Sequence, residues 1–225
     1  MYRKLLAIFR KDTLLDRAYS RSYEMLEITC LMFREIKQRL REDEKHQFSF
    51  DIMDQDIAVN RYEREVRRHV FNHLCVSGME DLNSGLVLTS IIIDIERIGD
   101  FTKNMVELAL AQKTTLKSSK FEKDIKKIED AIEDSFKRVR DVFEKGTVDE
   151  AKNLLKDYKW VNKSCDDHIN YFLTKDEKSF SSGEAVAYTL YFRYLKRINS
   201  HLRNIATSVV NPFDRIGFIL PKTKK

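Results

Sequence analysis

A chain of 225 residues is long enough to bury one large hydrophobic core or two small ones. Hydrophobic residues make up 42% of it and charged residues 34%, which excludes the composition of a disordered chain. The formal net charge of +5 comes from 41 basic residues interleaved with 36 acidic ones, so we expect no specific nucleic-acid binding.

The N-terminal stretch MYRKLLAIFRKD has an apolar run that extends only from Leu5 to Phe9. This run is too short for the apolar core of a signal peptide and far too short to span a bilayer. We therefore expect a cytoplasmic protein without a transmembrane segment, in which this stretch is the amphipathic start of the first helix. The alternative is contact with a membrane surface, because basic residues flank the run.

Hydrophobic periodicity predicts six helical segments. In chain order they span about residues 14–41, 51–74, 83–112, 120–144, 147 or 149 to 173, and 183–210. The only prolines are Pro212 and Pro221, so no proline interrupts the six segments. Gly146 is the expected C-cap of the fourth segment. Thr147 and Glu150 have the pattern of a capping box that would start the fifth.

Long helices joined by short loops favour antiparallel neighbours, hence an all-α bundle. An internal repeat adds to this: ERIGDFTKNMVELA at 96–109 aligns with KRINSHLRNIATSV at 196–209, with an offset of 100 residues. The fold predicted is six long helices in two homologous antiparallel three-helix bundles, over residues 1–116 and 117–210. The tail, 211–225, carries enough apolar side chains that we expect it to dock on the bundle or on a partner.

The stretch SIIIDIERIGDF, at 90–101, combines apolar and charged side chains on one helix. At 100° per residue, four isoleucines face the bundle, namely Ile91, Ile92, Ile95 and Ile98, while Ile93 falls on the charged flank. Glu96 and Asp100 lie one turn apart on that flank, where like charges are mildly destabilising. Arg97 and Lys103 are near enough to offset the repulsion. One interpretation is therefore a solvated flank with local ion pairs.

The other interpretation is a site for a hard cation. Two carboxylates one turn apart present their oxygens to a single ion if a second helix contributes further ligands. The second segment offers Asp56 and Asn60, also one turn apart, with Glu63 on the same side. If the second and third segments pack side by side, Asp56, Asn60, Glu96 and Asp100 converge.

The string DIERIGDFTKNM, at 94–105, resembles the signature of the PhoU family of phosphate-transport regulators, which reads close to DLERIGDHAxNI. The resemblance extends to the preceding helix, MDQDIAVNRYEREVRRHV, and to the whole chain in length and in its two three-helix halves. It implies a fold of two homologous three-helix bundles. It also implies a metal-binding motif, a carboxylate followed four residues later by Asp, paired between two helices of each repeat and often holding iron or zinc.

Carried over to this chain, Glu96 and Asp100 match the motif, and Asp56 matches the first member of the partner motif. Asn60 stands where an aspartate is expected. The resemblance thus implies a metal site in the first repeat, for iron, zinc or another divalent cation, at Asp56, Asn60, Glu96 and Asp100. The equivalent residues of the second repeat are Tyr158, Asn162, Lys196 and Ser200. A lysine ammonium at a ligand position repels a cation, so we expect no metal in the second repeat.

Other chemistry finds less support in the sequence. No glutamate stands three residues before any histidine, which argues against a ferritin-like di-iron enzyme. His69 and His73 are one turn apart and could bind a transition metal, although paired histidines on a basic helix are more often incidental. The three cysteines form no CxxC motif and suit reduced thiols. Without a phosphate loop, nucleophile elbow or dinucleotide fingerprint, no enzyme activity is expected.

By resemblance, we expect a cytosolic PhoU-like adaptor that regulates phosphate transport or phosphate-starvation signalling. Its partners would be a phosphate transporter or a sensor kinase at the cytoplasmic face of the membrane, and its half-exposed bundles are compatible with a homodimer. Two alternatives stay open. One is a carboxylate-ligated metalloprotein that stores or uses the metal, and the other is a helical scaffold without metal.

Overall fold

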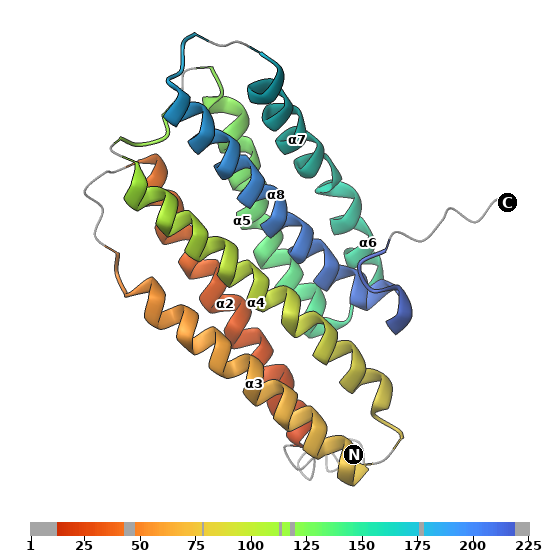
Figure 1. Cartoon of the computed structure of the whole chain (residues 1–225). Coiled ribbons are helices and arrows are strands. Elements are labelled where there is room, and N and C mark those ends of the chain that lie inside the picture. Colours follow the sequence, from red (N-terminus) through yellow and green to blue (C-terminus); the bar gives the residue numbers. More distant parts are fainter. Residues whose placement is uncertain are drawn as a thin grey trace, which may run out of the picture.

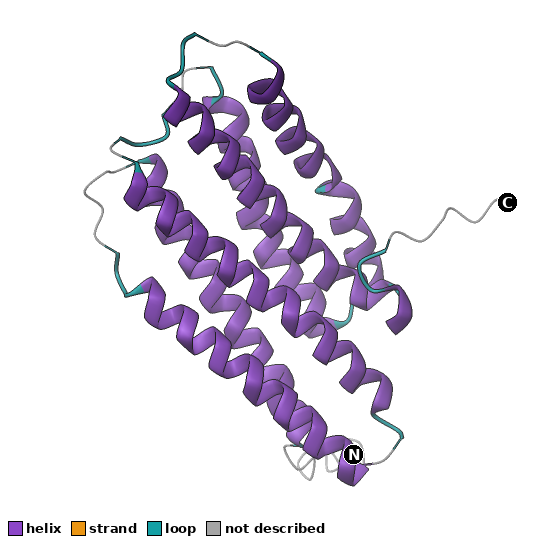
Figure 2. Ribbon diagram, in the orientation of Figure 1, coloured by secondary structure: helices purple, strands orange, loops and turns teal. Residues whose placement is uncertain are grey.

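The computed structural model describes residues 13–42, 48–77, 79–112, 114–117, 120–175 and 178–218. Throughout these ranges the elements are helices, which confirms the all-α prediction (Figure 2). They are α2 (Leu14–Arg41), α3 (Ile52–Ser77), α4 (Leu82–Ala111), α5 (Glu122–Lys145), α6 (Val148–Asp157), α7 (Lys159–Thr174), α8 (Ser182–Val210) and the 3₁₀ turn η1 (Phe213–Arg215). The predicted start of the first helix, at 1–12, lies outside the described residues.

The helices form two bundles side by side (Figure 1). The first consists of α2, α3 and α4, and the second of α5, the α6–α7 pair and α8. Between the bundles, α4 packs against α8 and α2 touches α5. The buried apolar side chains of both bundles therefore belong to one continuous core.

Some helix ends follow local sequence signals and others do not. α2 and α8 begin with capping boxes, formed by Thr13 with Asp16 and by Ser181 with Glu184. α5 ends at Gly146, whose φ of +64° is the left-handed conformation expected of a glycine C-cap. The capping box predicted at Thr147 and Glu150 is wrong, because the Thr147 side chain makes no capping hydrogen bond.

The fifth predicted helix is not continuous, since a turn at Tyr158 divides it into α6 and α7. The side-chain amide of Asn199, on α8, donates to the Tyr158 carbonyl at 3.4 Å. The Tyr158 hydroxyl bonds to Asp134 and Arg138 of α5. At the break, the Val161 amide bonds to the Tyr158 carbonyl three residues back, a tighter turn than that of an α-helix. The periodicity of the segment itself does not reveal it.

A buried polar network joins the two bundles. Arg41 at the end of α2 donates from Nε to the Oε1 of Glu129 on α5 at 2.9 Å, and from Nη2 to Glu122 at 2.7 Å. The hydroxyl of Tyr191 on α8 donates to the same Glu129 oxygen at 2.5 Å. Burial raises the pKa of Glu129, against the opposing influence of Arg41 and Tyr191. The network ties one helix of the first bundle to two of the second.

Several side-chain pairs join α4 to α8, and two of them occupy corresponding positions of the repeats. Asp94 accepts a 2.7 Å hydrogen bond from Nδ1 of His201, and the rings of Phe101 and Tyr194 lie 6.3 Å apart between centroids. In the 100-residue alignment of the repeats, 94 corresponds to 194 and 101 to 201. The same two positions therefore meet twice across this interface.

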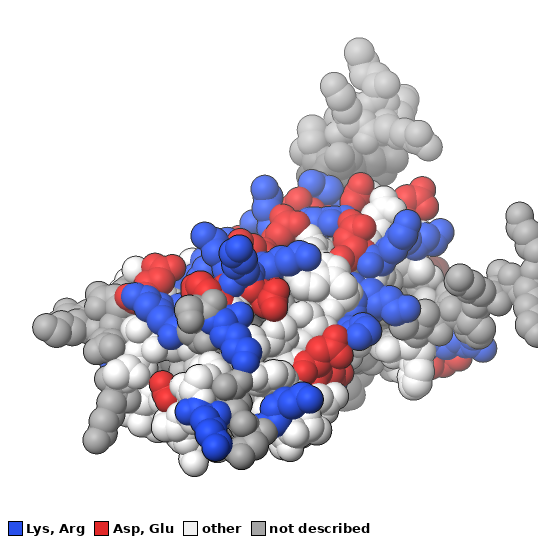
Figure 3. Space-filling model, turned by 90° about the horizontal axis from the view of Figure 1, so that it is seen from above, with Lys and Arg blue, Asp and Glu red and all other residues white. Residues whose placement is uncertain are grey.

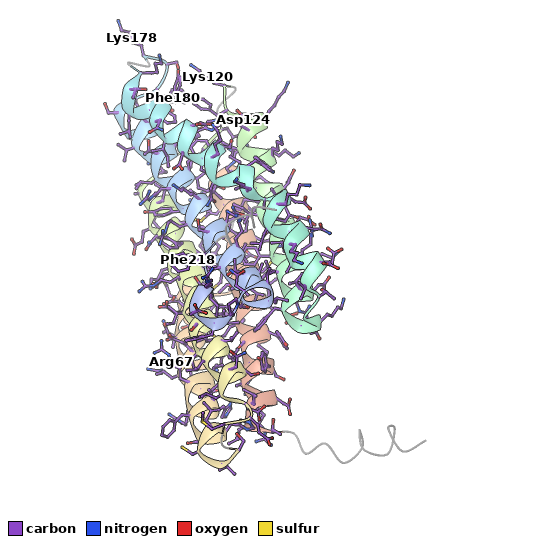
Figure 4. All side chains as sticks on the ribbon, turned by 90° about the vertical axis from the view of Figure 1, so that its right-hand side faces the viewer. Arg67, Lys120, Asp124, Lys178, Phe180 and Phe218 are labelled. Atoms are coloured by element: carbon purple, nitrogen blue, oxygen red, sulfur yellow. The ribbon has the colours of Figure 1, made fainter. Side chains whose placement is uncertain are left out.

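The described part of the tail folds back on the end of α8, which agrees with the docking prediction for Ile216 only. Phe213 and Phe218 are exposed, and Ile219 and Leu220 lie outside the described residues. The Gly217 amide donates to the hydroxyl of Thr207 at 2.7 Å, and Ile216 packs against the core. The Asn211 side chain donates to the carbonyls of Arg215 and Phe218. Figure 4 shows Phe218 beside the C-terminal turns of α8.

Candidate functional site

The predicted site residues lie where α4 packs against α3. The four isoleucines predicted to face the bundle are fully buried, whereas Ile93 is 42% exposed, so the orientation of α4 is the one that periodicity predicts. This orientation places Glu96 and Asp100 on the flank that faces α3. The charges of Asp56 and Glu63 on α3 act on Glu96. We call Asp56, Glu63, Glu96 and Asp100 the acidic cluster.

α3 and α4 pack closely at this cluster. A Cβ at Gly99 would lie 3.6 Å from the Val59 side chain and 4.0 Å from the Asp56 carboxylate, which is ordinary van der Waals contact. Asp56 lies almost buried against α4, with 7% of its surface exposed. An alanine would fit at Gly99 without displacing Asp56, so the packing of the two helices sets the depth of this carboxylate.

The ammonium of Lys103 bridges the two helices inside the acidic cluster. Its Nζ lies 3.1 Å from Oδ2 of Asp56 and 3.4 Å from Oδ1 of Asp100. Asn60 donates its side-chain amide to the same Asp56 oxygen at 3.3 Å. Arg97 lies 3.2 Å from Asp100 and 3.7 Å from Glu96. Lys103 and Arg97 therefore offset the repulsion between the acids, as the sequence indicates.

The corresponding place in the second repeat holds amides and a hydroxyl. Asn162 donates to the Ser200 hydroxyl at 2.9 Å and accepts from Asn199 at 2.8 Å. Asn199 occupies the position of Gly99. The Lys196 ammonium turns to Asp166, at 2.6 Å. The acids of the first repeat are thus replaced by a network of neutral donors and acceptors, beside a lysine paired elsewhere.

The family model for the PhoU domain matches this chain twice, over residues 23–109 and 125–209. The chain belongs to the PhoU family. Each PhoU domain match includes one of the motif-bearing helices, α4 in the first and α8 in the second. The resemblance carried by the ERIGD string is therefore confirmed, together with the fold of two repeats.

Two solved PhoU structures share the fold. The phosphate transport system regulatory protein PhoU from Streptococcus pneumoniae aligns with a TM-score of 0.75 and 13% identity, over 87% of this chain and 92% of that one. PhoU from Pseudomonas aeruginosa also aligns with a TM-score of 0.75, at 20% identity, over 87% of this chain and 95% of that one. No curated protein matches the sequence.

The PhoU metal motif does not fit a metal ion as these side chains lie. The Lys103 ammonium occupies the position between Asp56 and Asp100 that a bridging cation would take. Within the described ranges, no group of three or more His, Cys, Asp and Glu side chains is arranged to hold a metal ion. Metal binding by Asp56, Asn60, Glu96 and Asp100 stays a prediction, and it requires Lys103 to move away.

The electrostatics of the acidic cluster mark it as a strained site of this PhoU chain. Partial burial raises the pKa of Glu96, the charge of Asp100 raises it further, and Arg97 opposes both. Burial acts to lower the pKa of Lys103, but the hydrogen bond and charge of Asp56 raise it overall. Titratable groups that perturb one another in this way gather at functional sites.

Other candidate groups lie elsewhere. Nε2 of His73 lies 2.8 Å from Asp81, so this histidine pairs with an acid in the turn before α4. Lys and Arg are intermixed with Asp and Glu over the end of the molecule seen in Figure 3. No helix in the described part of the chain has the length and apolar character that a membrane span requires.

Sequence reasoning missed the reach of Lys103 to Asp56. The sequence shows Lys103 three residues from Asp100, but its contact with α3 depends on how α4 packs against α3. One feature of the sequence could have indicated this contact. Lys103 stands at the variable position of the DLERIGDHAxNI signature, on the same flank of the helix as the acids.

Proposed function

We propose that this chain is a regulatory adaptor for phosphate transport or phosphate-starvation signalling. The observation that carries the proposal is the pair of PhoU domain matches, which together span most of both bundles. The solved relative from Streptococcus pneumoniae is itself named a phosphate transport system regulatory protein. The partner we propose is a phosphate transporter or its sensor kinase, met at the cytoplasmic face of the membrane. The role is binding, not catalysis.

The outer face of α3 is the surface that best suits such a partner. Met53, Ile57 and Phe71 are each half or more exposed and recur at helical spacing. Arg61, Arg64 and Arg68 lie on the same exposed face. Figure 4 shows the neighbouring Arg67 projecting from α3 away from the bundle. Exposed apolar side chains rimmed by arginines suit a segment that is apolar at its centre and acidic at its edges.

A deletion strain tests the adaptor role directly. Loss of the gene should change phosphate uptake or phosphate-starvation signalling, and the intact gene should restore both. The double variant Ile57→Glu/Phe71→Glu should fail to restore them, because two carboxylates oppose an acidic partner and remove the apolar contact. Its melting temperature should match that of the parent, since both side chains are exposed.

The matched control is Leu173→Glu, which adds a carboxylate at an equally exposed apolar position on α7. This variant should restore the phenotype fully. Normal phosphate uptake and normal signalling in the deletion strain would overturn the adaptor proposal. If the phenotype appears but both sets of variants restore it, the role stands and the α3 face is the wrong surface. Sedimentation of the same proteins tests the homodimer.

A further inference from the structure

A small polar pocket lies beneath the folded-back tail, in the second repeat. It has a volume of about 200 Å³ and is lined by Leu155, Asn162, Ser200, Arg203, Asn204, Thr207 and Gly217. A water molecule occupies roughly 30 Å³ in the liquid. The pocket therefore has room for a small polyatomic ion together with water. We call it the Arg203 pocket.

Arg203 is the charged residue of this lining, and within the described part of the chain it forms no ion pair with a carboxylate. Its Nη2 donates to the Leu155 carbonyl at 3.5 Å, a long hydrogen bond. Its Nε is buried and has no hydrogen-bond partner. A buried guanidinium nitrogen without an acceptor is energetically unfavourable, because it loses its hydrogen bonds to water and no protein acceptor replaces them.

The remaining polar groups of the pocket include no carboxylate. The hydroxyls of Ser200 and Thr207 donate to the carbonyls of Lys196 and Asn204, so the donors left beside Arg203 are those of the two side-chain amides. Each side-chain amide uses one N–H within the protein and has a second one to offer: Asn162 donates to Ser200, and Asn204 donates to Asp94. Asp94 is outside the lining and is also bonded to His201. The field inside the pocket is therefore set by one guanidinium and the amide dipoles around it.

Comparison with the first repeat shows a cation at the same position but different surroundings. With an offset of 100, Arg203 corresponds to Lys103 and Ser200 to Asp100. Lys103 lies between two carboxylates, whereas Arg203 shares its pocket with hydroxyls and amides. The second repeat thus has the cation without the acids that balance it in the first.

We propose that the Arg203 pocket binds a small tetrahedral oxyanion of the phosphate or sulfate class. A guanidinium presents its N–H groups in a planar fork that matches two oxygens of such an ion. The two amides supply neutral donors to the remaining oxygens. This site goes beyond the adaptor role and does not depend on it.

The energetics and the tail support the same assignment. Burial lowers the pKa of Arg203, in keeping with its buried Nε, which has no hydrogen-bond partner. Gly217, at φ +85°, forms part of the pocket wall and holds the tail to α8 through its hydrogen bond to Thr207. A bound oxyanion would therefore strengthen the attachment of residues 211–218 to α8.

Isothermal titration calorimetry with inorganic phosphate tests the proposal, in a chloride buffer of constant ionic strength. The parent protein should bind one phosphate per chain, and sulfate should compete for the site. Arg203→Met should weaken binding by about tenfold or more, because it removes the charge-assisted pair. Arg203→Lys should give an intermediate affinity, since a lysine keeps the charge but loses the planar fork.

The matched control is Arg193→Met, which removes an exposed arginine from the same helix. It should change phosphate affinity less than about twofold, since exposed charges contribute little. Melting curves without phosphate should show that Arg203→Met is folded, because replacing an uncompensated buried cation by an apolar chain is neutral or stabilising. The proposal is overturned if phosphate binds the parent no better than chloride, or if Arg203→Met binds phosphate as the parent does.

Discussion

The Lys103 ammonium on α4 and the Asp56 carboxylate on α3 form an ion pair 3.1 Å long across the helix contact that carries the PhoU motif. The same ammonium reaches Asp100, so a covalently attached cation stands between carboxylates of both helices. A divalent ion would have to displace it. Lys103 therefore decides whether the metal prediction made from the sequence can be realised.

Lys103→Met should create a better metal site than the parent has. Removing the ammonium leaves Asp56 without its ionic partner and leaves Glu96 and Asp100 with Arg97 alone, so the cluster has an excess negative charge that a divalent cation can neutralise. We expect affinity for Zn²⁺ or Mn²⁺ to rise by about tenfold or more in the variant, measured by calorimetry. Adding Glu96→Ala and Asp100→Ala to Lys103→Met should abolish the gain.

The control for this change is Lys163→Met, which removes a lysine paired with one acid on the exposed surface of α7. It should leave metal affinity as in the parent. A parent protein that already binds metal as tightly as Lys103→Met would show that the lysine moves aside readily. In that case the four residues predicted from the sequence form a working metal site with Lys103 present.

Glu96→Gln should make stability less dependent on pH. The pKa of Glu96 is raised in the folded protein, so the folded state holds this proton more tightly than the unfolded chain does. The free energy of unfolding contributed by Glu96 therefore rises as the pH falls from 7 toward the ordinary value of 4.5, and levels off below it. At pH 7 the variant should be at least as stable as the parent, with the difference vanishing on acidification.

Thermal unfolding at several pH values between about 4 and 7 measures this effect. Glu107→Gln, at an exposed position on the same helix, is the control and should follow the parent curve. A Glu96→Gln variant that is clearly less stable than the parent at pH 7 would contradict the account. It would mean that Arg97 stabilises the Glu96 carboxylate by more than Asp100 and burial destabilise it.

Glu129→Ala should be strongly destabilising, because it removes the buried acceptor of the Arg41 guanidinium and leaves only the half-exposed Glu122 as its ionic partner. Removing one partner of a buried ion pair typically lowers the free energy of unfolding by about 3–5 kcal/mol. Tyr191→Phe removes only a hydroxyl from the same oxygen and should lower it by about 1 kcal/mol. Urea unfolding measures both values.

Glu133→Ala is the matched control on α5, since Glu133 pairs with Lys37 and Arg34 closer to the surface. It should lower the free energy of unfolding by less than about 1 kcal/mol. Equal effects of Glu129→Ala and Glu133→Ala would show that the buried network contributes no more than a surface pair does.

Most of the helical architecture could be predicted from sequence because it depends on local signals. Amphipathic periodicity located the long helices, and the scarcity of glycine and proline excluded most alternatives to them. Gly146 indicated a helix end because glycine readily adopts the positive φ of a helix C-cap, and the structure shows this φ. The break at Tyr158 was not predicted, and the contacts that Tyr158 makes there, with α5 and with Asn199, join residues far apart in the sequence.

The candidate site was predicted in part for the same physical reason. Residues on one helix face, such as Glu96 and Asp100, are related by a fixed rotation, so their proximity follows from spacing alone. The contact of Lys103 with Asp56 and the pairing of Arg41 with Glu129 depend on how helices far apart in sequence pack. The Arg203 pocket was not predicted, because its main feature is an arginine without a carboxylate partner. Whether an arginine has such a partner depends on how the helices pack, which the sequence alone does not show.

The paired contacts between α4 and α8 have a consequence for how the two repeats choose each other. Position 94 meets 201 while 194 meets 101, which is the reciprocal pattern of a twofold-symmetric dimer, here built within one polypeptide. A first repeat docked on another first repeat would set Asp94 against Phe101, a carboxylate against a ring with no donor to offer. Divergence at these two positions therefore makes the halves complementary to each other and disfavours exchange between identical halves of neighbouring molecules.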